Sequence, residues 1–150
     1  MPEKNHPLCL CVDCGGQRQL LGDCRLCGSF QIPEAIVETL IFNIKVGYPI
    51  VEDAVGRFET YLDAACDAGF KSMILIHGYG SSGPGGLIRK AIRSNLENNY
   101  YVQNVSDYYF GENLQFGNLT YEKLLKRRSS IKKHSAQFIG NLGVSVLLLK

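Results

Sequence analysis

Cysteines are concentrated near the start of the chain, at a spacing that suits a metal ion. Five of the six cysteines lie in the first 27 residues. They include two CxxC pairs separated by nine residues, and each pair is followed by a glycine, which readily adopts the strained backbone of a tight turn. Two such turns can bring four thiolates together in the tetrahedral arrangement that Zn²⁺ prefers. The predicted ligands are Cys11, Cys14, Cys24 and Cys27.

Three other chemistries use the same kind of thiol: an iron–sulfur site, a pair of disulfides and a redox-active CxxC. The N-terminus lacks the apolar segment of a signal peptide, so we expect a cytoplasmic protein with reduced thiols, which disfavours disulfides. A redox CxxC usually opens a helix in a larger fold. We predict one structural Zn²⁺ in a ribbon over residues 1–32, with Cys9 and His6 as additional candidate ligands. Cys66 is predicted to be a small buried apolar residue.

A second chemical pattern, "ILIHGYGSSGPGGLIRKAIRSNL", covers residues 74–96. An apolar run ends at His77, several glycines follow, and a basic amphipathic stretch begins. Free N–H groups at a helix start attract phosphate, and glycines let a phosphate approach the backbone. A P-loop is excluded because it requires GxxxxGK[ST], and Pro84 disfavours a dinucleotide fingerprint. The predicted phosphate-contacting residues are Gly78, Gly80, Arg89, Lys90 and Arg93.

The elements that must position these residues follow from the hydrophobic pattern. Apolar runs predict strands, and apolar residues at helical spacing predict helices. The predicted strands cover 39–46, 72–76, 100–105 and 143–149, and the predicted helices cover 50–69 and 86–96. The order strand, helix, strand, helix, strand, strand implies an α/β fold, more narrowly an α+β two-layer sandwich, over residues 33–150.

A basic insert, at about 107–140, separates the last two predicted strands. The segment is too long for a plain connection. Residues 120–139 are expected to form a helix that begins near Thr120. Its charged face is a candidate nucleic-acid contact, although such faces are commonly just solvated. The cations are Lys126, Arg127, Arg128, Lys132 and Lys133.

Charge and hydropathy restrict the kind of partner. The formal net charge is only +2, but residues 101–150 carry seven Lys and Arg against three Asp and Glu. The positive field is therefore concentrated in the last third of the chain. The apolar segment "VSVLLL" is too short to cross a bilayer, so no membrane association is expected. Aromatic residues could stack on unpaired bases, although about half of them are expected in the core; they are Tyr100, Tyr101, Tyr108, Tyr109 and Phe110.

The segment around His77 resembles the core of the Smr (small MutS-related) domain. His77, Gly78 and Gly80 stand in the HGxG signature of that domain, and residues 87–92 match the start of its following helix. The helix over 50–69 and the closing "GNLGVSVLLL" are similar to the first helix and the last strand of the family. The resemblance covers residues 41–109 and 140–149.

The resemblance implies a fold like the C-terminal domain of bacterial translation initiation factor three, and binding to DNA or RNA. Some Smr domains are endonucleases, and these carry an LDxH or LDxR motif on the first strand. This chain has Phe42-Asn43-Ile44-Lys45 there, so an amide replaces the acidic residue. His77 and Lys45 are the candidate catalytic residues, and His77 could instead hydrogen-bond within the loop.

Three functions are consistent with the sequence. The first is a nucleic-acid-binding protein in which the insert widens the basic surface. The second is a DNA or RNA endonuclease that uses His77 and Lys45. The third is a protein-interaction module whose zinc ribbon docks on a protein partner, which the neutral charge of residues 1–30 allows.

Overall fold

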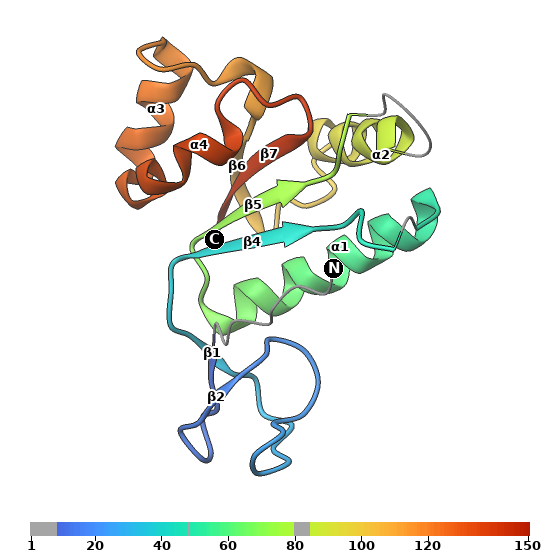
Figure 1. Ribbon diagram of the computed structural model, residues 1–150, viewed down its shortest axis with the longest axis vertical. Coiled ribbons are helices and arrows are strands. Elements are labelled where there is room, and N and C mark those ends of the chain that lie inside the picture. The colour runs from blue at the N-terminus through green and yellow to red at the C-terminus, as the bar shows by residue number, and fades with distance from the viewer. Residues whose placement is uncertain (1–8, 48, 80–84) are drawn as a thin grey trace.

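A computed structural model describes residues 9–47, 49–79 and 85–150. It contains a small three-stranded sheet and a larger four-stranded sheet. The small sheet lies at one end of the molecule, below the larger sheet in Figure 1. Mixed α/β structure is thereby confirmed. None of the helices in the described part of the chain combines the length and the apolar character needed to span a membrane.

The small sheet is formed by the ribbon, by which we mean residues 9–35. Its strands are β1 (Cys9–Leu10), β2 (Gln17–Arg18) and β3 (Glu34–Ala35), in the order β2-β1-β3 with antiparallel pairing. Each strand has only two residues, so backbone pairing contributes little to the stability of the ribbon. β3 lies just after residue 32, where the sequence analysis places the domain boundary.

The larger sheet has the strand order β4-β5-β7-β6. Its strands are β4 (Thr39–Asn43), β5 (Ser72–Ile76), β6 (Val105–Phe110) and β7 (Val144–Leu149). β4 and β5 are parallel, and β7 is antiparallel to both β5 and β6. β5 and β7 are central strands covered on both faces, which explains their continuous apolar sequences.

Two helices cover one face of this sheet. α1 (Val51–Ala68) buries Ala54, Phe58, Leu62 and Ala65 at helical spacing and ends at Gly69, whose φ of 96° is left-handed. α2 (Gly85–Glu97) adds Ile88, Ile92 and Leu96 to the same hydrophobic cluster. Because α1 and α2 follow parallel strands, both helices begin at the edge of the sheet where β4 and β5 end (Figure 1).

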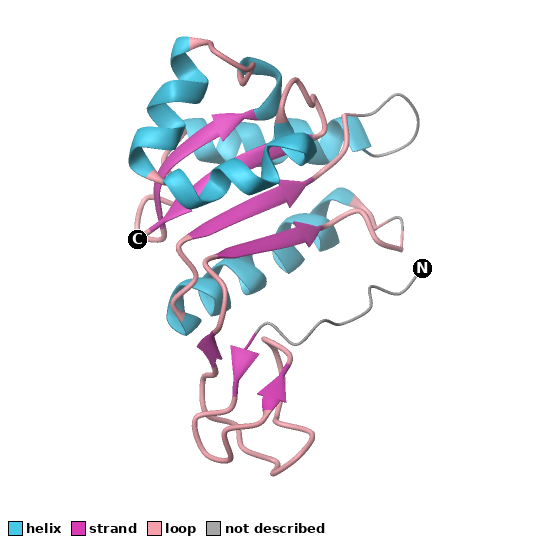
Figure 2. Ribbon diagram, turned by 60° about the vertical axis from the view of Figure 1, so that its left-hand side comes forward, coloured by secondary structure: helices cyan, strands magenta, loops and turns pink. Residues whose placement is uncertain are grey.

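The insert covers the opposite face, so the fold has three layers and the expected two-layer sandwich is wrong (Figure 2). The insert contains η1 (Gly111–Asn113), α3 (Leu119–Arg127), η2 (Ser129–His134) and α4 (Ser135–Phe138). Leu124, Ile131 and Phe138 are fully buried against the sheet. The physical reason is that the strands present apolar side chains on this face too, and these require a cover.

Two predicted elements differ from the structure. Residues 100–104 form turns rather than a strand, and the strand begins at Val105. Tyr101 packs edge-to-face on Phe58, with ring centroids 5.1 Å apart, so tertiary packing holds this segment at the end of α2. The predicted helix over 120–139 is broken at Arg128, where φ is −151° and ψ is 79°, and the side chain of Asn118, not Thr120, caps α3.

Candidate metal centre and nucleic-acid interface

The two CxxC turns have the same backbone geometry. In each turn the amide of the first cysteine donates to a carbonyl five residues later, at 2.8 Å in both cases. The glycine after each pair has a left-handed backbone, with φ of 74° at Gly15 and 77° at Gly28, and its amide donates back to the first cysteine. The turns therefore present their thiols in equivalent orientations toward a common centre.

The four thiols converge at the spacing of a metal site. The Sγ atoms of Cys11 and Cys27 lie 3.6 Å apart, and those of Cys14 and Cys24 lie 3.8 Å apart. All four sulfurs lie within 4.8 Å of one another. A tetrahedron with Zn–S bonds of about 2.3 Å has an edge of about 3.8 Å, so the sulfurs fit this ion. These separations exceed a disulfide bond of about 2.05 Å.

The backbone of the turns also favours thiolates. The amide of Cys14, foremost among several hydrogen-bond donors, lowers the pKa of the Cys11 thiol to about 6. The pKa of the Cys24 thiol is also lowered, and the largest cause is a hydrogen bond from the backbone amide of Cys27. Metals bind the thiolate form, so the lowered pKa values of Cys11 and Cys24 favour metal binding. Cys27 differs, because the Ser29 amide lowers its pKa but burial and the neighbouring thiols raise it to about 12.

Cys9, one of the two additional candidate ligands, is not part of this cluster. Cys9 is fully buried in the same hydrophobic cluster as α1, and its burial raises its pKa. His6 lies outside the described residues. Cys66 is half-buried on α1, with its thiol 3.5 Å from the carbonyl oxygen of Asn104, whereas the sequence analysis places it in the core.

His77 is buried immediately after β5. Its Nδ1 lies 2.7 Å from the carbonyl oxygen of Gly78, which can only accept a hydrogen bond, so Nδ1 carries the proton. Nε2 then accepts from the hydroxyl of Ser145 on β7, at 2.8 Å. The His77 side chain is 1 % exposed, and burial is the largest cause that lowers its pKa to about 4. Nδ1 therefore bonds within the loop, and Nε2 bonds the loop to the central strand β7.

The buried imidazole makes stability depend on pH. We expect the free energy of unfolding to fall by about 3 kcal/mol as pH falls from 6.5 to about 4, because the unfolded chain binds a proton there and the folded chain does not. His77→Gln should remove this part of the pH dependence. Urea unfolding followed by circular dichroism at both pH values measures the difference. An NMR titration giving His77 a pKa near 6.5 would contradict the prediction.

Lys45 lies against the backbone of the HGxG loop. A Cβ built on Gly78 would lie 2.6 Å from Cδ of Lys45, so the lysine stem crosses the space that only glycine leaves free. Gly78 has a φ of 74°, which also favours glycine. Asn43 accepts the backbone amide of Lys45 at 2.9 Å, which shapes the turn after β4. The structure thus brings Lys45, Asn43 and Gly78 to one edge, and Lys45 is exposed there.

Arg89 and Arg93 are paired with Glu112 rather than free. The Glu112 carboxylate lies 2.7 Å from Arg89 and 2.5 Å from Arg93. The two arginines lower the pKa of Glu112 to about 2, and the hydrogen bond from Arg93 has the largest effect. The Arg93 guanidinium also lies 3.8 Å above the ring of Phe110. Glu112 of η1 therefore supplies a carboxylate to both arginines, which the sequence pattern does not indicate. Lys90 is exposed, and Gly80 lies outside the described residues.

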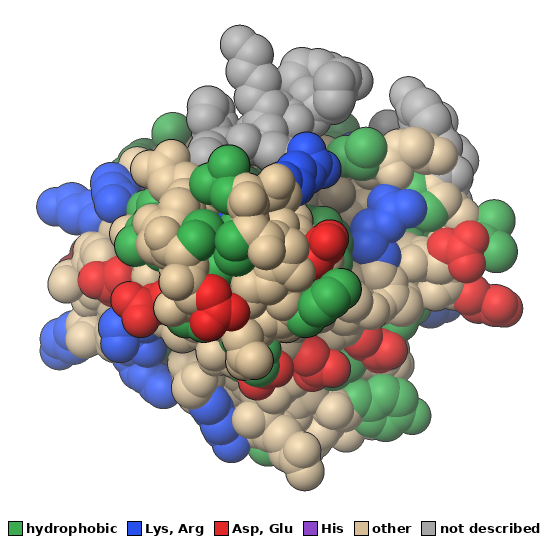
Figure 3. Space-filling view, turned by 90° about the horizontal axis from the view of Figure 1, so that it is seen from below, with side chains coloured by type: hydrophobic (Ala, Val, Ile, Leu, Met, Phe, Trp, Pro, Cys, Tyr) green, Lys and Arg blue, Asp and Glu red, His purple; other side chains and the backbone are tan. Residues whose placement is uncertain are grey.

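The basic residues of the insert lie at the other edge of the sheet. Arg127 pairs with Asp107 near the start of β6, at 3.0 Å, and Ser130 donates to Glu38, which precedes β4. Arg128 is half-buried, whereas Lys126, Lys132 and Lys133 are exposed. A stretch of Lys and Arg side chains follows one margin of the molecule in Figure 3. The cations of the insert therefore do not adjoin the HGxG loop, because they lie where β4 and β5 begin.

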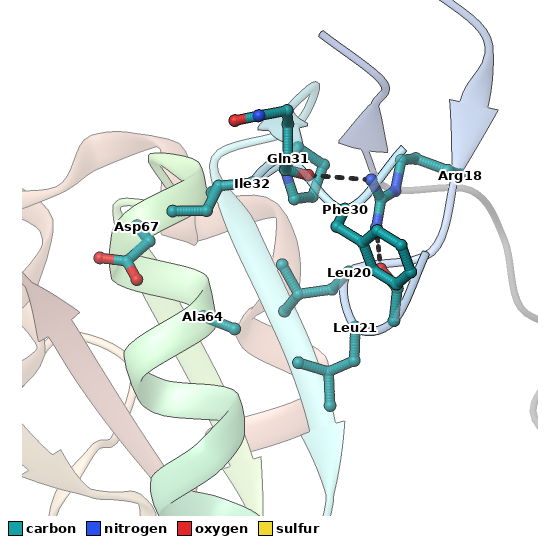
Figure 4. A pocket seen from close by; sticks show the side chains of 10 residues that line it. Arg18, Leu20, Leu21, Phe30, Gln31, Ile32, Ala64 and Asp67 are labelled. Atoms are coloured by element: carbon teal, nitrogen blue, oxygen red, sulfur yellow. Dashed lines mark hydrogen bonds between the residues drawn. The ribbon is translucent and has the colours of Figure 1, made fainter. Parts of the chain in front are cut away.

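A crevice of about 190 Å³ separates the ribbon from α1 (Figure 4). Leu20, Leu21 and Ile32 of the ribbon face Ala64 of α1 across it. Arg18 at its margin is 4 % exposed and donates to the carbonyl oxygens of Gln19, Gln31 and Gly22. This arginine cross-links the loops of the ribbon. Nothing in the sequence distinguishes it from an ordinary exposed cation.

The segment that contains the HGxG loop is similar to a known protein family. The family model described as "Smr domain" matches residues 50–114. Residues 50–114 are therefore similar to an Smr domain. The solved Smr domain of MutS2 from Thermus thermophilus is similar to this chain, with a TM-score of 0.43 and 20 % identity over 76 % of this chain and 99 % of that one. A comparison with curated proteins gives no match.

The Smr match contains α1, β5, the HGxG loop, α2 and β6. It leaves out the four cysteines, Lys45 and β7. β7 nevertheless contacts the HGxG loop through the turn before it, because the carbonyl of Gly143 accepts hydrogen bonds from the amides of His77 and Gly78 at 2.9 and 3.0 Å. This role of Gly143 is not predicted from the sequence, although the glycine-containing segment before the last strand is a signal for it.

Proposed function

We propose that this protein binds nucleic acid at the edge of the sheet where β4 and β5 end, and that its ribbon holds one structural Zn²⁺. The observation that carries the binding proposal is the position of Lys45 across Gly78. It places an exposed ammonium group beside the HGxG loop of the Smr domain. The Smr resemblance implies DNA or RNA as the ligand, and a phosphodiester backbone is the anion that a lysine at this edge would contact.

Arg89 and Arg93 position the binding edge and do not themselves contact the phosphate in this proposal. Arg89 donates to the carbonyl of Leu142 at 3.1 Å, and both arginines bind Glu112, so they fix α2 against the loop before β7. The loop edge is thereby held rigid while Lys45 and Lys90 remain exposed. We propose Lys45 and Lys90 as the phosphate contacts and Arg89 and Arg93 as positioning residues.

The endonuclease function has less support. A general base must come within hydrogen-bond distance of the proton that it removes. His77 is buried, and both of its ring nitrogens already have partners. We therefore propose that His77 supports the loop and that the loop binds phosphate without using His77 for hydrolysis.

Substitution of Lys45 tests the binding proposal. Lys45→Gln should weaken binding of labelled DNA and RNA oligonucleotides about tenfold at low salt and reduce the log–log salt slope by about 0.7 to 0.9, the effect of one lost phosphate contact. Fluorescence anisotropy across a salt series measures both quantities. Lys71→Gln is the matched control, because Lys71 is an exposed lysine at the opposite end of β5. Equal effects of the two substitutions would contradict the assignment of this edge.

A third variant tests the insert in the same assay. Lys126, Lys132 and Lys133 are exposed and lie away from Lys45, so replacing all three with Gln should leave the salt slope unchanged. A slope reduced by about 2 would instead place the nucleic acid on the insert.

A further inference from the structure

The edge that carries Lys45 also exposes apolar side chains. Five apolar or aromatic side chains at this edge are between 44 and 62 % exposed. They lie after β4, before α1, after β5, on the first turn of α2 and before β7. These residues are Val46, Ile50, Tyr79, Leu87 and Leu142. They lie at or next to the connections at one edge of a single sheet, the edge that carries the HGxG loop.

Direct contacts show that these connections belong to one surface. The turn before β7 accepts two amides from the HGxG loop through Gly143, and Arg89 of α2 binds the carbonyl of Leu142. Lys45 reaches across Gly78 from the end of β4. Tyr79 is the next residue after Gly78, is 56 % exposed, and is the aromatic side chain of this group.

The combination of groups indicates the chemistry of the ligand. Lys45 and Lys90 offer two exposed cations, whereas the nearby carboxylate of Glu112 is neutralised by two arginines. Phosphate alone would not require an exposed aromatic ring beside the cations, and an apolar partner would not require the cations. An unpaired nucleotide presents both a phosphate and a flat base that can stack on a tyrosine. In a duplex that face is covered by the neighbouring bases.

We infer that this edge binds single-stranded nucleic acid, with Tyr79 stacking on an unpaired base and Lys45 contacting an adjacent phosphate; the inference rests on the proposed nucleic-acid binding. Two carboxylates, Glu52 and Asp53, occupy the first turn of α1. They repel phosphate on that side, so the strand runs from Lys45 toward α2 and Lys90.

The test compares a labelled oligothymidylate with a blunt-ended DNA duplex in the same anisotropy assay. Tyr79→Ala should weaken oligothymidylate binding by about 5-fold to 100-fold, the effect of one lost base–aromatic stack, and should leave the duplex affinity unchanged. Tyr79→Phe keeps the ring and should retain binding. Tyr100→Ala is the matched control, because Tyr100 is 69 % exposed and lies beyond the other end of α2.

The outcomes separate this inference from the proposed function. Equal losses for oligothymidylate and the blunt-ended duplex, or no loss with Tyr79→Ala, would overturn base stacking. The proposed function would survive if Lys45→Gln still weakened binding. Failure of the wild-type protein to bind either nucleic acid would overturn both. Because Tyr79 is exposed, each variant should keep the wild-type melting temperature, which makes misfolding detectable.

Discussion

Removal of the metal is expected to unfold the ribbon and to destabilise the α/β body. The ribbon has three strands of two residues each and exposes Leu26, Phe30 and Ile32, so it buries too little apolar surface to fold alone. The apparent free energy of binding of structural Zn²⁺ is roughly 10 to 16 kcal/mol in small zinc-binding peptides. We expect metal binding to be the main source of stability of the ribbon. We expect one Zn²⁺ per chain, bound by Cys11, Cys14, Cys24 and Cys27.

The effect should extend beyond the ribbon, because Leu20 packs into the same hydrophobic cluster as Phe58 and Leu62 of α1. Loss of one buried leucine costs about 1.5 to 3 kcal/mol. The body should therefore remain folded after chelation and unfold at a lower urea concentration. Two-dimensional NMR before and after chelation separates the two regions, and urea titration measures the second effect.

Cysteine variants provide the control for the metal prediction. Cys11→Ser should abolish stoichiometric zinc, whereas Cys66→Ser should retain it, because the Cys66 thiol is not part of the cluster. Elemental analysis of freshly purified reduced protein gives the metal content. Iron in place of zinc, or an NMR spectrum that chelation leaves unchanged, would refute the proposed centre.

Gly111→Ala should produce the largest loss of stability from a single added methyl group. Gly111 begins η1, where the chain leaves β6, and it is buried. A Cβ there would lie 2.7 Å from the carbonyl oxygen of Phe138 and 2.9 Å from that of Val144, and nearer still to that of Asn141. Backbone carbonyls cannot rotate away as side chains can. We expect a loss of roughly 3 kcal/mol in the free energy of unfolding, or failure to fold.

Gly56→Ala is the matched control for this substitution. Gly56 lies within α1, has no atom within 4 Å of a built Cβ, and does not have a positive φ. Alanine there should stabilise the protein by about 0.5 to 1 kcal/mol, since glycine disfavours helix. Urea unfolding of both variants measures the contrast. A Gly111→Ala protein as stable as wild type would show that the two ends of the insert are not in contact.

The sequence was sufficient where local chemistry determines structure. The spacing of Cys11, Cys14, Cys24 and Cys27 identified the thiols that converge, and the apolar run over Ser72–Ile76 identified β5. Equivalent turns of a few residues place those thiols, so no distant contact is needed to predict the cluster.

The parts that could not be predicted depend on contacts between distant segments. Glu112 pairs with Arg89 and Arg93 only because the fold brings η1 beside α2. Apolar residues at helical spacing in the insert indicate a buried face, but not which face of the sheet it covers. His77 likewise looks like a free base until Ser145 of β7 is placed beside it.

The position of β7 has a consequence for how the chain folds. β7 comes last in sequence order yet lies between β5 and β6, with Ser72 opposite Leu148. Until β7 is inserted, β5 has an open edge and β6 has no partner in the sheet. Long-range pairing of this kind slows folding, because much of the chain must be ordered before the contacts form. Because the carbonyl of Gly143, just before β7, accepts the amides of His77 and Gly78, we expect completion of the sheet and docking of the HGxG loop to occur together.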